Sequence, residues 1–424
     1  MTWHVVHLGD THGRVDERSS DQYASLDEAI GHGRELAAAG TLALWAHPGD
    51  IFHTVSDAQT RNALFRRIMT MADLAPVVIV RGNHDLTGEL DVFAWLRGKY
   101  PIVVSQRPEL LTIETPIWIP ALGGTTKRLC ASVWTAPYPD KAVLVATGTP
   151  PDQVAQVGRV ALDNLMMYGA AELAARPDTM KLVLGHGNVV GAQSSTGQPQ
   201  IGKELEFDRA MFERFDPDVY VGMNHIHKHQ QVGRAVFAGS SCRLDFGELE
   251  PKGIIVADFA PATDPVRVAF RGWRFVALDV AAMYHVEGEL TPEGFTFAVV
   301  KSDGERLADG ERPASWRGAD VRVSYRYNPA ELPRLNVALI HAEFAEARSL
   351  KIVAIPDRVT DIRAPEVLAA VTVHDKLQAF AEHAGLEWTD ELAALAAIIE
   401  TQPVDRWQAD AVQAIAAIGT DVSG

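Results

Sequence analysis

Polar side chains follow five apolar runs along the first half of the chain, and a glycine begins each group. The five segments are Gly9-Asp10-Thr11-His12, Gly49-Asp50-Ile51-Phe52-His53, Gly82-Asn83-His84-Asp85, Gly185-His186 and Gly222-Met223-Asn224-His225-Ile226-His227. Carboxylate, carboxamide and imidazole ligands without thiolates suit manganese, iron or zinc. These segments hold more candidate ligands than one ion can bind. Two ions roughly 3.5–4 Å apart that share a carboxylate would accommodate them and would serve in-line attack on phosphorus.

Each segment taken alone has a structural explanation. An aspartate after a strand is usually a turn residue or a helix cap. A lone histidine in a strand, such as His4 or His7, more often packs in the core than binds a metal. Five such segments in succession are not explained by turns. In α/β folds the carboxyl ends of strands gather side chains from distant sequence positions, and glycine lets the backbone approach a ligand closely.

Short apolar runs predict the strands that position these residues. The predicted strands are Trp3–Leu8, Leu42–Ala46, Val77–Val80, Lys181–Leu184 and Val219–Val221. Amphipathic segments alternate with them, and Ser25 with Glu28 and Ser56 with Gln59 predict capping boxes at helix starts. A helix is also predicted over residues 151–176. Its predicted buried side consists of Leu162, Leu165, Met166 and Tyr168. The alternation predicts an α/β domain over residues 1–270.

The remainder of the chain predicts two smaller parts. Residues 271–360 form a predicted α+β unit. Its predicted elements are strands at Phe275–Val280, Asp320–Tyr327 and Leu350–Ile355, with a helix over Leu332–Ala347. Residues 361–424 are rich in alanine and leucine, which predicts two or three helices interrupted at Gly385 and Pro403. From residue 365 onward this tail has ten acidic residues and two basic ones, so we do not expect it to contact DNA.

Composition limits the class of protein. The chain has 424 residues, of which 47% are hydrophobic, enough for a large core. Two separated cysteines, Cys130 and Cys242, indicate a reduced, cytoplasmic protein. Met1–Leu8 reads as a strand and not as a signal peptide, and no apolar run would span a membrane. The net charge of −16 argues against coating nucleic acid unaided, but metal ions and a local basic surface can attract phosphate.

The series DTH, GDIFH, GNHD, GH and HIH resembles the calcineurin-like metallophosphoesterases. The resemblance covers residues 1–258 and implies two sheets flanked by helices. Narrower features resemble the SbcD group of DNA repair nucleases. These features are His53 after GDIF, Gly185–Ala192, Gly239-Ser240-Ser241, Arg243–Glu248 and Lys252-Gly253. Asn224 replaces the usual glycine of the last motif, and His229 stands where a proline is common, while both histidine ligand positions are kept.

The resemblance implies a role for each site residue. Asp10, His12 and His227 would hold one metal ion. Asn83, His186 and His225 would hold the other, and Asp50 would bridge the two. Manganese is the expected metal. His84 would act on the phosphate, His53 would position the scissile strand, and Asp85 would either orient His84 or form a turn.

The implied function is a DNA exonuclease or endonuclease, the nuclease subunit of an SbcCD-like repair and recombination complex. The helical tail would bind the coiled-coil SbcC-type ATPase, residues 271–360 would cap the site, and a homodimer is compatible with the resemblance. Candidate DNA contacts are Lys127 and Arg128, Arg271 and Arg274, and Arg322 and Arg326. One alternative is a stand-alone phosphoesterase acting on nucleotides or small phosphoesters. Another is a non-catalytic scaffold, which the intact set of ligand positions disfavours.

Overall fold

The protein is described from a computed structural model. It forms two compact units, Met1–Ile355 and Pro356–Gly424. The residues that the structure describes are 2–14, 19–86, 88–120, 126–195, 204–246, 248–262, 267–300, 306–307, 313–357 and 365–401.

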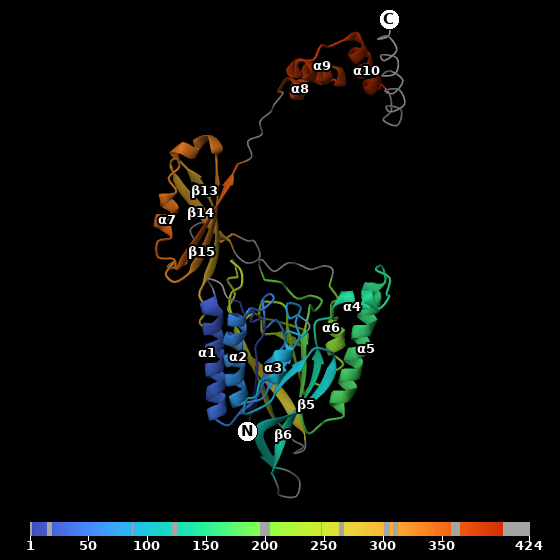
Figure 1. Cartoon of the computed structure of the whole chain (residues 1–424), viewed down its shortest axis with the longest axis vertical. Coiled ribbons are helices and arrows are strands. Elements are labelled where there is room, and N and C mark those ends of the chain that lie inside the picture. Colours follow the sequence, from blue (N-terminus) through green and yellow to red (C-terminus); the bar gives the residue numbers. More distant parts are fainter. Residues whose placement is uncertain are drawn as a thin grey trace. The chain divides into compact units, whose positions relative to one another are not determined.

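Two six-stranded sheets form the larger part of the first unit (Figure 1). The first has the order β12-β11-β1-β2-β3-β4, with β1 (Trp3–His7), β2 (Leu42–His47), β3 (Val77–Val80), β4 (Ile102–Ser105), β11 (Gly253–Pro261) and β12 (Val268–Ala277). The second has the order β5-β6-β7-β8-β10-β9, with β5 (Glu109–Pro120), β6 (Thr126–Ala136), β7 (Met180–His186), β8 (Val219–Asn224), β9 (Gln230–Val232) and β10 (Ala235–Phe237). Strands β1 to β4 are mutually parallel, as are β6 to β8. All five predicted strands are therefore present.

The two sheets pack face to face and helices cover their outer faces. Buried residues of both sheets, such as Val5, Leu182 and Tyr220, share one core. Helices α1 (Ser19–Ala38), α2 (Ala58–Leu74) and α3 (Asp91–Trp95) accompany the first sheet, while α4 (Lys141–Ala146), α5 (Val154–Ala174) and α6 (Arg209–Phe212) accompany the second. This is the α/β two-sheet fold that the sequence predicted.

Several local predictions differ from the structure. Helix α1 begins at Ser19, so Ser25 lies inside it and bonds back to the carbonyl of Gln22. The cap of α2 is Asp57, whose carboxylate accepts a hydrogen bond from the Thr60 N–H. Tyr168 was predicted to be buried but is 58% exposed, because it lies on the outer side of α5.

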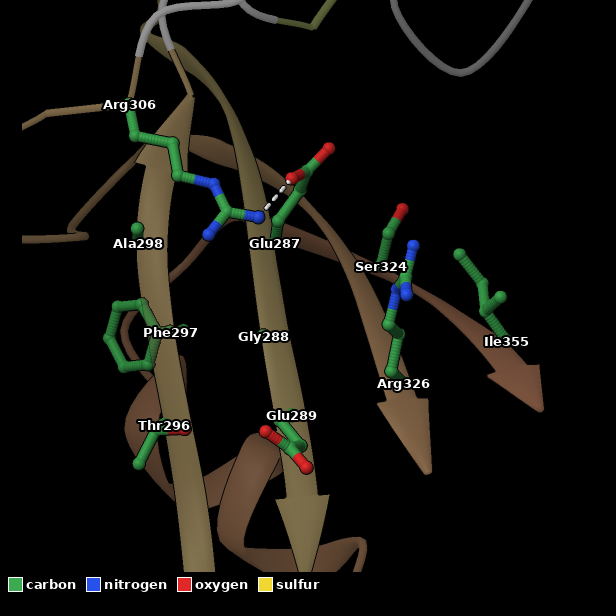
Figure 2. A pocket seen from close by; sticks show the side chains of 10 residues that line it. All are labelled: Glu287, Gly288, Glu289, Thr296, Phe297, Ala298, Arg306, Ser324, Arg326 and Ile355. Carbon is green, nitrogen blue, oxygen red and sulfur yellow. Dashed lines mark hydrogen bonds and ion pairs between the residues drawn. The ribbon is translucent and has the colours of Figure 1, made fainter. Parts of the chain in front are cut away.

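A four-stranded sheet follows in the first unit, in the order β14-β13-β15-β16. Its strands are β13 (Met283–Thr291), β14 (Gly294–Val300), β15 (Asp320–Tyr327) and β16 (Ser349–Pro356). One face packs on its own core with α7 (Ala338–Glu343), and the other forms a pocket of about 600 Å³ (Figure 2). The predicted long helix is split between a 3-10 turn at Pro329–Arg334 and α7. Since β12 of the first sheet passes through residue 271, the boundary expected there is not observed.

The second unit contains α8 (Pro365–Ala369), α9 (Val373–Ala384) and α10 (Asp390–Thr401). Gly385 ends α9 in a left-handed conformation, φ 67°, which glycine adopts without strain. Pro403 lies outside the described residues. Among the helices that the structure describes, none is long and apolar enough to cross a membrane.

Candidate metal centre

The five glycine-led segments meet at the carboxyl ends of strands from both sheets. Asp10 and Asp50 follow β1 and β2, while His186 ends β7 and His225 follows β8. The structure brings three groups of acidic and imidazole side chains within metal-binding distance of one another. These groups are Asp10 with His12 and Asp50, Asp50 with His186 and His225, and His12 with His53 and His84.

Asp50 lies between two clusters of nitrogen ligands. On one side its Oδ2 is 3.6 Å from Nε2 of His12, which is itself 3.1 Å from Nε2 of His227. On the other side the same Oδ2 is 3.3 Å from Nε2 of His186. The carboxamide oxygen of Asn83 is 3.0 Å from this His186 nitrogen and 2.9 Å from Nδ1 of His225. Asp10 also lies in one group with His12 and Asp50, so the other six sequence-predicted ligands are gathered around the Asp50 carboxylate.

The donor set fits two divalent cations. Nε2 of His12 and Nε2 of His227 face each other, and a cation could accept both lone pairs. Burial favours the neutral form of His186, but the Asp50 carboxylate outweighs it and raises the pKa of His186 to about 9, so a cation that binds beside Asp50 would displace this proton. Burial lowers the pKa of His12 well below its ordinary value, which keeps that ring neutral and able to bind a metal.

Backbone strain is concentrated at the same residues. Among the described residues, four that are not glycine have φ in the left-handed range: Asp10 at 45°, His12 at 48°, Asp50 at 53° and His225 at 109°. All four belong to the candidate centre. Such conformations cost of order 1–3 kcal/mol each and cluster at functional sites.

Glycine is required where ligands crowd the backbone. A Cβ atom on Gly49 would lie 2.3 Å from Nδ1 of His186, and Gly49 also has φ of 96°. A Cβ atom on Gly82 would lie 2.1 Å from Oδ1 of Asp50. The glycines of these segments therefore allow close approach, as the sequence predicted.

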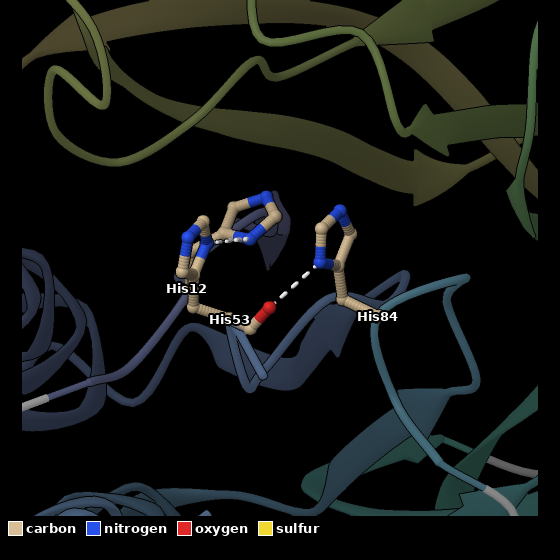
Figure 3. Close-up of side chains that lie close together, drawn as sticks. All are labelled: His12, His53 and His84. Atoms are coloured by element: carbon tan, nitrogen blue, oxygen red, sulfur yellow. Dashed lines mark hydrogen bonds between the residues drawn. The ribbon is translucent and has the colours of Figure 1, made fainter. Parts of the chain in front are cut away.

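His53 and His84 lie side by side next to His12 (Figure 3). Their rings are stacked, with centroids 5.6 Å apart and planes 12° apart. Nδ1 of His84 is 2.7 Å from the carbonyl oxygen of His53, so this nitrogen carries a proton and donates it. Nδ1 of His53 is 3.3 Å from Nδ1 of His12, so His53 contacts this candidate ligand on the ring nitrogen that does not face His227.

Asp85 does not orient His84, in contrast to one of the two roles expected for it. Its carboxylate is buried and accepts hydrogen bonds from backbone N–H groups of the second and third segments. The donors are Asp50 (2.8 Å), Gly82 (2.9 Å), Ile51 (3.0 Å) and Phe52 (3.2 Å). Burial and the nearby Asp50 carboxylate raise the pKa of Asp85 to about 7. Asp85 therefore has the turn-forming role.

Asn224, which replaces a family glycine, holds Asp10 in place. Its Nδ2 donates to Asp10 Oδ2 at 2.9 Å and to the carbonyl of Gly239 at 3.1 Å. Its Oδ1 is 2.6 Å from Nε2 of His7, and Nδ1 of His7 is 2.7 Å from the Tyr220 hydroxyl. Burial lowers the pKa of His7 to about 4. The chain of bonds is complete with a neutral His7, so this histidine is a support and not a ligand.

Two buried glutamates also contact candidate ligands, and sequence reasoning assigned neither of them. Glu204 Oε2 is 3.0 Å from Nε2 of His225, and Glu248 Oε1 is 3.5 Å from Nδ1 of His227. Glu248 lies in the Arg243–Glu248 segment that carries the narrower resemblance, which was a usable signal. Glu204 belongs to none of the five segments and could not be found from spacing.

The arginine and lysine residues expected to contact DNA are widely distributed. Lys127 and Arg128 lie at the amino end of β6, whereas the candidate ligands lie at the carboxyl ends of the parallel strands. Arg274 pairs with Asp258 at 2.9 Å, and Arg271 donates to the carbonyl of Pro261. Arg271 and Arg274 therefore both have partners on β11.

The other two, Arg322 and Arg326, lie on the same side of β15. Arg326 lines the pocket of the four-stranded sheet together with Ser324, while Glu287 and Arg306 form an ion pair there (Figure 2). Arg322 and Arg326 remain candidates for contact with a polyanion.

One comparison with known protein families covers the segments that form this site. The calcineurin-like phosphoesterase family model matches residues 4–229, more than half of the chain. The fold is similar to the calcineurin-like phosphoesterase YfkN from Bacillus subtilis, with 13% identity and a TM-score of 0.38, covering 72% of this chain and 92% of YfkN. GAP50, the anchor in the inner membrane complex of Plasmodium, is similar with 11% identity and a TM-score of 0.36, covering 65% of this chain and 84% of GAP50. No curated protein matches the chain significantly.

The matched residues include all five segments, from Asp10 to His227. Their side chains converge in the geometry that a binuclear centre needs. The chain therefore belongs to the calcineurin-like phosphoesterases, which hydrolyse phosphoesters with divalent metal ions.

Proposed function

We propose that this phosphoesterase cleaves phosphodiester bonds in DNA with manganese, as the nuclease subunit of an SbcCD-like repair and recombination complex. The observation that carries the proposal is the stacked pair of His53 and His84 beside the metal-binding residues. Two imidazoles outside the candidate ligand set would be available to contact the phosphate beside the metal ions.

The residues divide into those that would hold metals and those that would act on the substrate. Bound ions would supply an activated water and neutralise charge on the phosphate. Asp10, His12 and His227 would hold one, Asn83, His186 and His225 the other, and Asp50 both. His84 keeps its Nδ1 proton on the His53 carbonyl, so Nε2 is the nitrogen left to face the phosphate; as an imidazolium, protonated on both nitrogens, His84 would donate its Nε2 proton to the departing oxygen and become neutral. The His84 backbone N–H donates to Asp50 Oδ1 at 2.9 Å, which ties this ring to the centre.

Features outside the site support a polymeric substrate and a protein partner. Arg322 and Arg326 lie on one face of the four-stranded sheet, where Arg326 shares a pocket with Arg306, Glu287 and Glu289, and we expect the arginines to supply the phosphate contacts. In the second unit Phe380 and Leu386 are 53% and 58% exposed. Large apolar side chains at such exposure are typical of surfaces that bind a partner helix.

The test compares substrates of different size on one preparation. The full chain loaded with Mn²⁺ should hydrolyse bis(p-nitrophenyl) phosphate and degrade linear DNA, and a co-expressed SbcC-type ATPase should stimulate cleavage of duplex DNA. His84→Ala should lower both activities roughly 10²–10⁴-fold. Hydrolysis of nucleotides or phosphomonoesters without any cleavage of DNA would instead support a stand-alone phosphoesterase.

A further inference from the structure

Glu204 and Glu248 each lie against one histidine of the same short segment, His225-Ile226-His227. We propose that these two carboxylates are positioning residues that fix which ring nitrogen each histidine presents to the metals: Nδ1 of His225 and Nε2 of His227. The inference rests on the binuclear centre of the proposed function and adds how one His-x-His segment serves two different ions.

The His225 ring is held between two oxygens. Nδ1 is 2.9 Å from the Asn83 carboxamide oxygen, on the side of the second ligand cluster. Nε2 is 3.0 Å from Glu204 Oε2, and the side chains of His225 and Glu204 are only 7% and 6% exposed. Glu204 also accepts a hydrogen bond from the Tyr138 hydroxyl. A buried carboxylate against Nε2 keeps the proton on that nitrogen and leaves the Nδ1 lone pair for a cation.

In the His227 ring the two nitrogens have exchanged roles: Nδ1 faces a glutamate and Nε2 faces the candidate ligands. Its Nε2 is 3.1 Å from Nε2 of His12, in the first ligand cluster, and its Nδ1 is 3.5 Å from Glu248 Oε1. Glu248 is fully buried, and among the described residues Oε1 has no hydrogen-bond partner other than this approach to His227. Lys252 Nζ is 2.9 Å from Glu248 Oε2 and 3.0 Å from the His227 carbonyl oxygen. Lys252 therefore binds both the Glu248 carboxylate and the backbone of His227, the histidine that Glu248 faces.

The opposite assignments have a chemical consequence. A neutral imidazole can carry its proton on either nitrogen, and only the deprotonated nitrogen binds a metal. Without Glu204, the proton of the His225 ring could move to Nδ1, or the ring could rotate. Without Glu248, the proton of the His227 ring could move to Nε2, or that ring could rotate. Loss of such a carboxylate partner typically lowers metal affinity about 10–100-fold. Each glutamate should affect one ion and leave the other.

The experiment measures metal binding and not turnover. The full chain, stripped with chelator, is titrated with Mn²⁺ by calorimetry, and two binding events are expected. Glu204→Ala should weaken one event about 10–100-fold and Glu248→Ala the other. The Gln variants, which keep an acceptor without the charge, should be intermediate. Glu206→Ala is the matched control, because this exposed neighbour of Glu204 contacts Asn188.

A double-mutant cycle makes the assignment decisive. Glu204→Ala should add nothing to His225→Ala but should keep its full effect on His227→Ala. Equal effects in both backgrounds, or no effect in the wild-type background, would overturn the proposal. If circular dichroism shows that a Glu248 variant is unfolded, the Glu204 arm still decides. Two intact binding events in a protein that does not cut DNA would refute the nuclease role alone.

Discussion

The carboxylate of Asp85 lies 2.8 Å from the backbone nitrogen of Asp50 and accepts its hydrogen. The same carboxylate binds the next two backbone N–H groups after Asp50 and that of Gly82. A buried acceptor therefore joins the loop after β2 to the loop after β3. It holds the backbone of the candidate bridging ligand in its left-handed conformation.

Removing this acceptor should loosen both loops. We expect Asp85→Ala to lower the free energy of unfolding by about 3 kcal/mol, because several buried N–H groups lose their partner. Urea denaturation of the chelator-stripped protein measures this loss. Asp91→Ala, at an exposed aspartate at the start of α3, is the matched control. Equal stability of the two variants would contradict the role given to Asp85.

Activity should depend on a borderline divalent metal. Protein treated with chelator should be inactive. Mn²⁺ should restore hydrolysis of a small phosphodiester best, and Mg²⁺ should restore it poorly, because the ligand set is rich in imidazole. Initial rates over a range of metal concentrations provide the measurement. Full activity with Mg²⁺ alone would show that the nitrogen ligands do not determine the choice of metal.

Asp50 and His84 should separate metal binding from turnover. Asp50→Ala should lose both bound metal and activity, since Asp50 lies between the two ligand clusters. His84→Ala should keep its metal content and lose roughly 10²–10⁴-fold in turnover, as expected for a proton donor. Metal content is measured by plasma mass spectrometry. If His84→Ala were as poor in metal as Asp50→Ala, His84 would be a ligand.

The buried network of His7 should make the metal-free protein sensitive to acid. The pKa of His7 is about 4 in the folded state and about 6.5 when exposed. The unfolded state therefore takes up the proton first. The stabilisation is complete above pH 6.5 and is lost as the pH falls toward 4, by at most about 3 kcal/mol. His7→Gln should flatten this part of the stability curve measured by urea denaturation.

His4→Gln is the control for that comparison, because His4 lies on the same strand but contacts Asp258 and not the network. A curve for His7→Gln that keeps the full acid loss would place the responsible proton on another group. Buried His47, whose pKa burial lowers to about 3, would then be the next group to test.

The tail should bind the ATPase without contributing to chemistry. Deleting the residues after 361 should leave hydrolysis of a small phosphodiester nearly unchanged and abolish co-purification with the ATPase. Phe380→Asp with Leu386→Asp should reproduce this loss in the full chain, since both side chains are exposed. Val143→Asp, at a residue of α4 that is 58% exposed, should have no effect. Retention of the ATPase by the truncated protein would return the tail to a structural role.

The sequence predicted the candidate ligands because their signal is local. Each is a chemically distinctive side chain within a few residues of a glycine at the end of an apolar run. The partners of the supporting residues have no such signal, even where the residue itself lies in one of the five segments. Asn224 reaches Asp10 and His7, 214 and 217 positions away, and only the packing of the two sheets brings them together.

Element boundaries failed for similar reasons. Ser25 fits a capping pattern, but the helix already begins at Ser19, so a favourable cap sequence does not show where a helix begins. The strands β13 and β14 were not predicted at all. Both alternate between polar and apolar residues, yet their antiparallel pairing and the parallel pairing of β13 with β15 depend on distant residues.

The left-handed backbone at four residues of the candidate centre lowers the free energy of unfolding of this chain. These residues are Asp10, His12, Asp50 and His225. Glycine at any of these positions would relieve strain of order 1–3 kcal/mol while removing a ligand. A lineage that no longer needed hydrolysis would therefore become more stable by replacing these strained metal-binding residues. Selection for thermal resistance alone should therefore erode the active site first, and laboratory evolution of this protein would have to score catalysis and heat tolerance together.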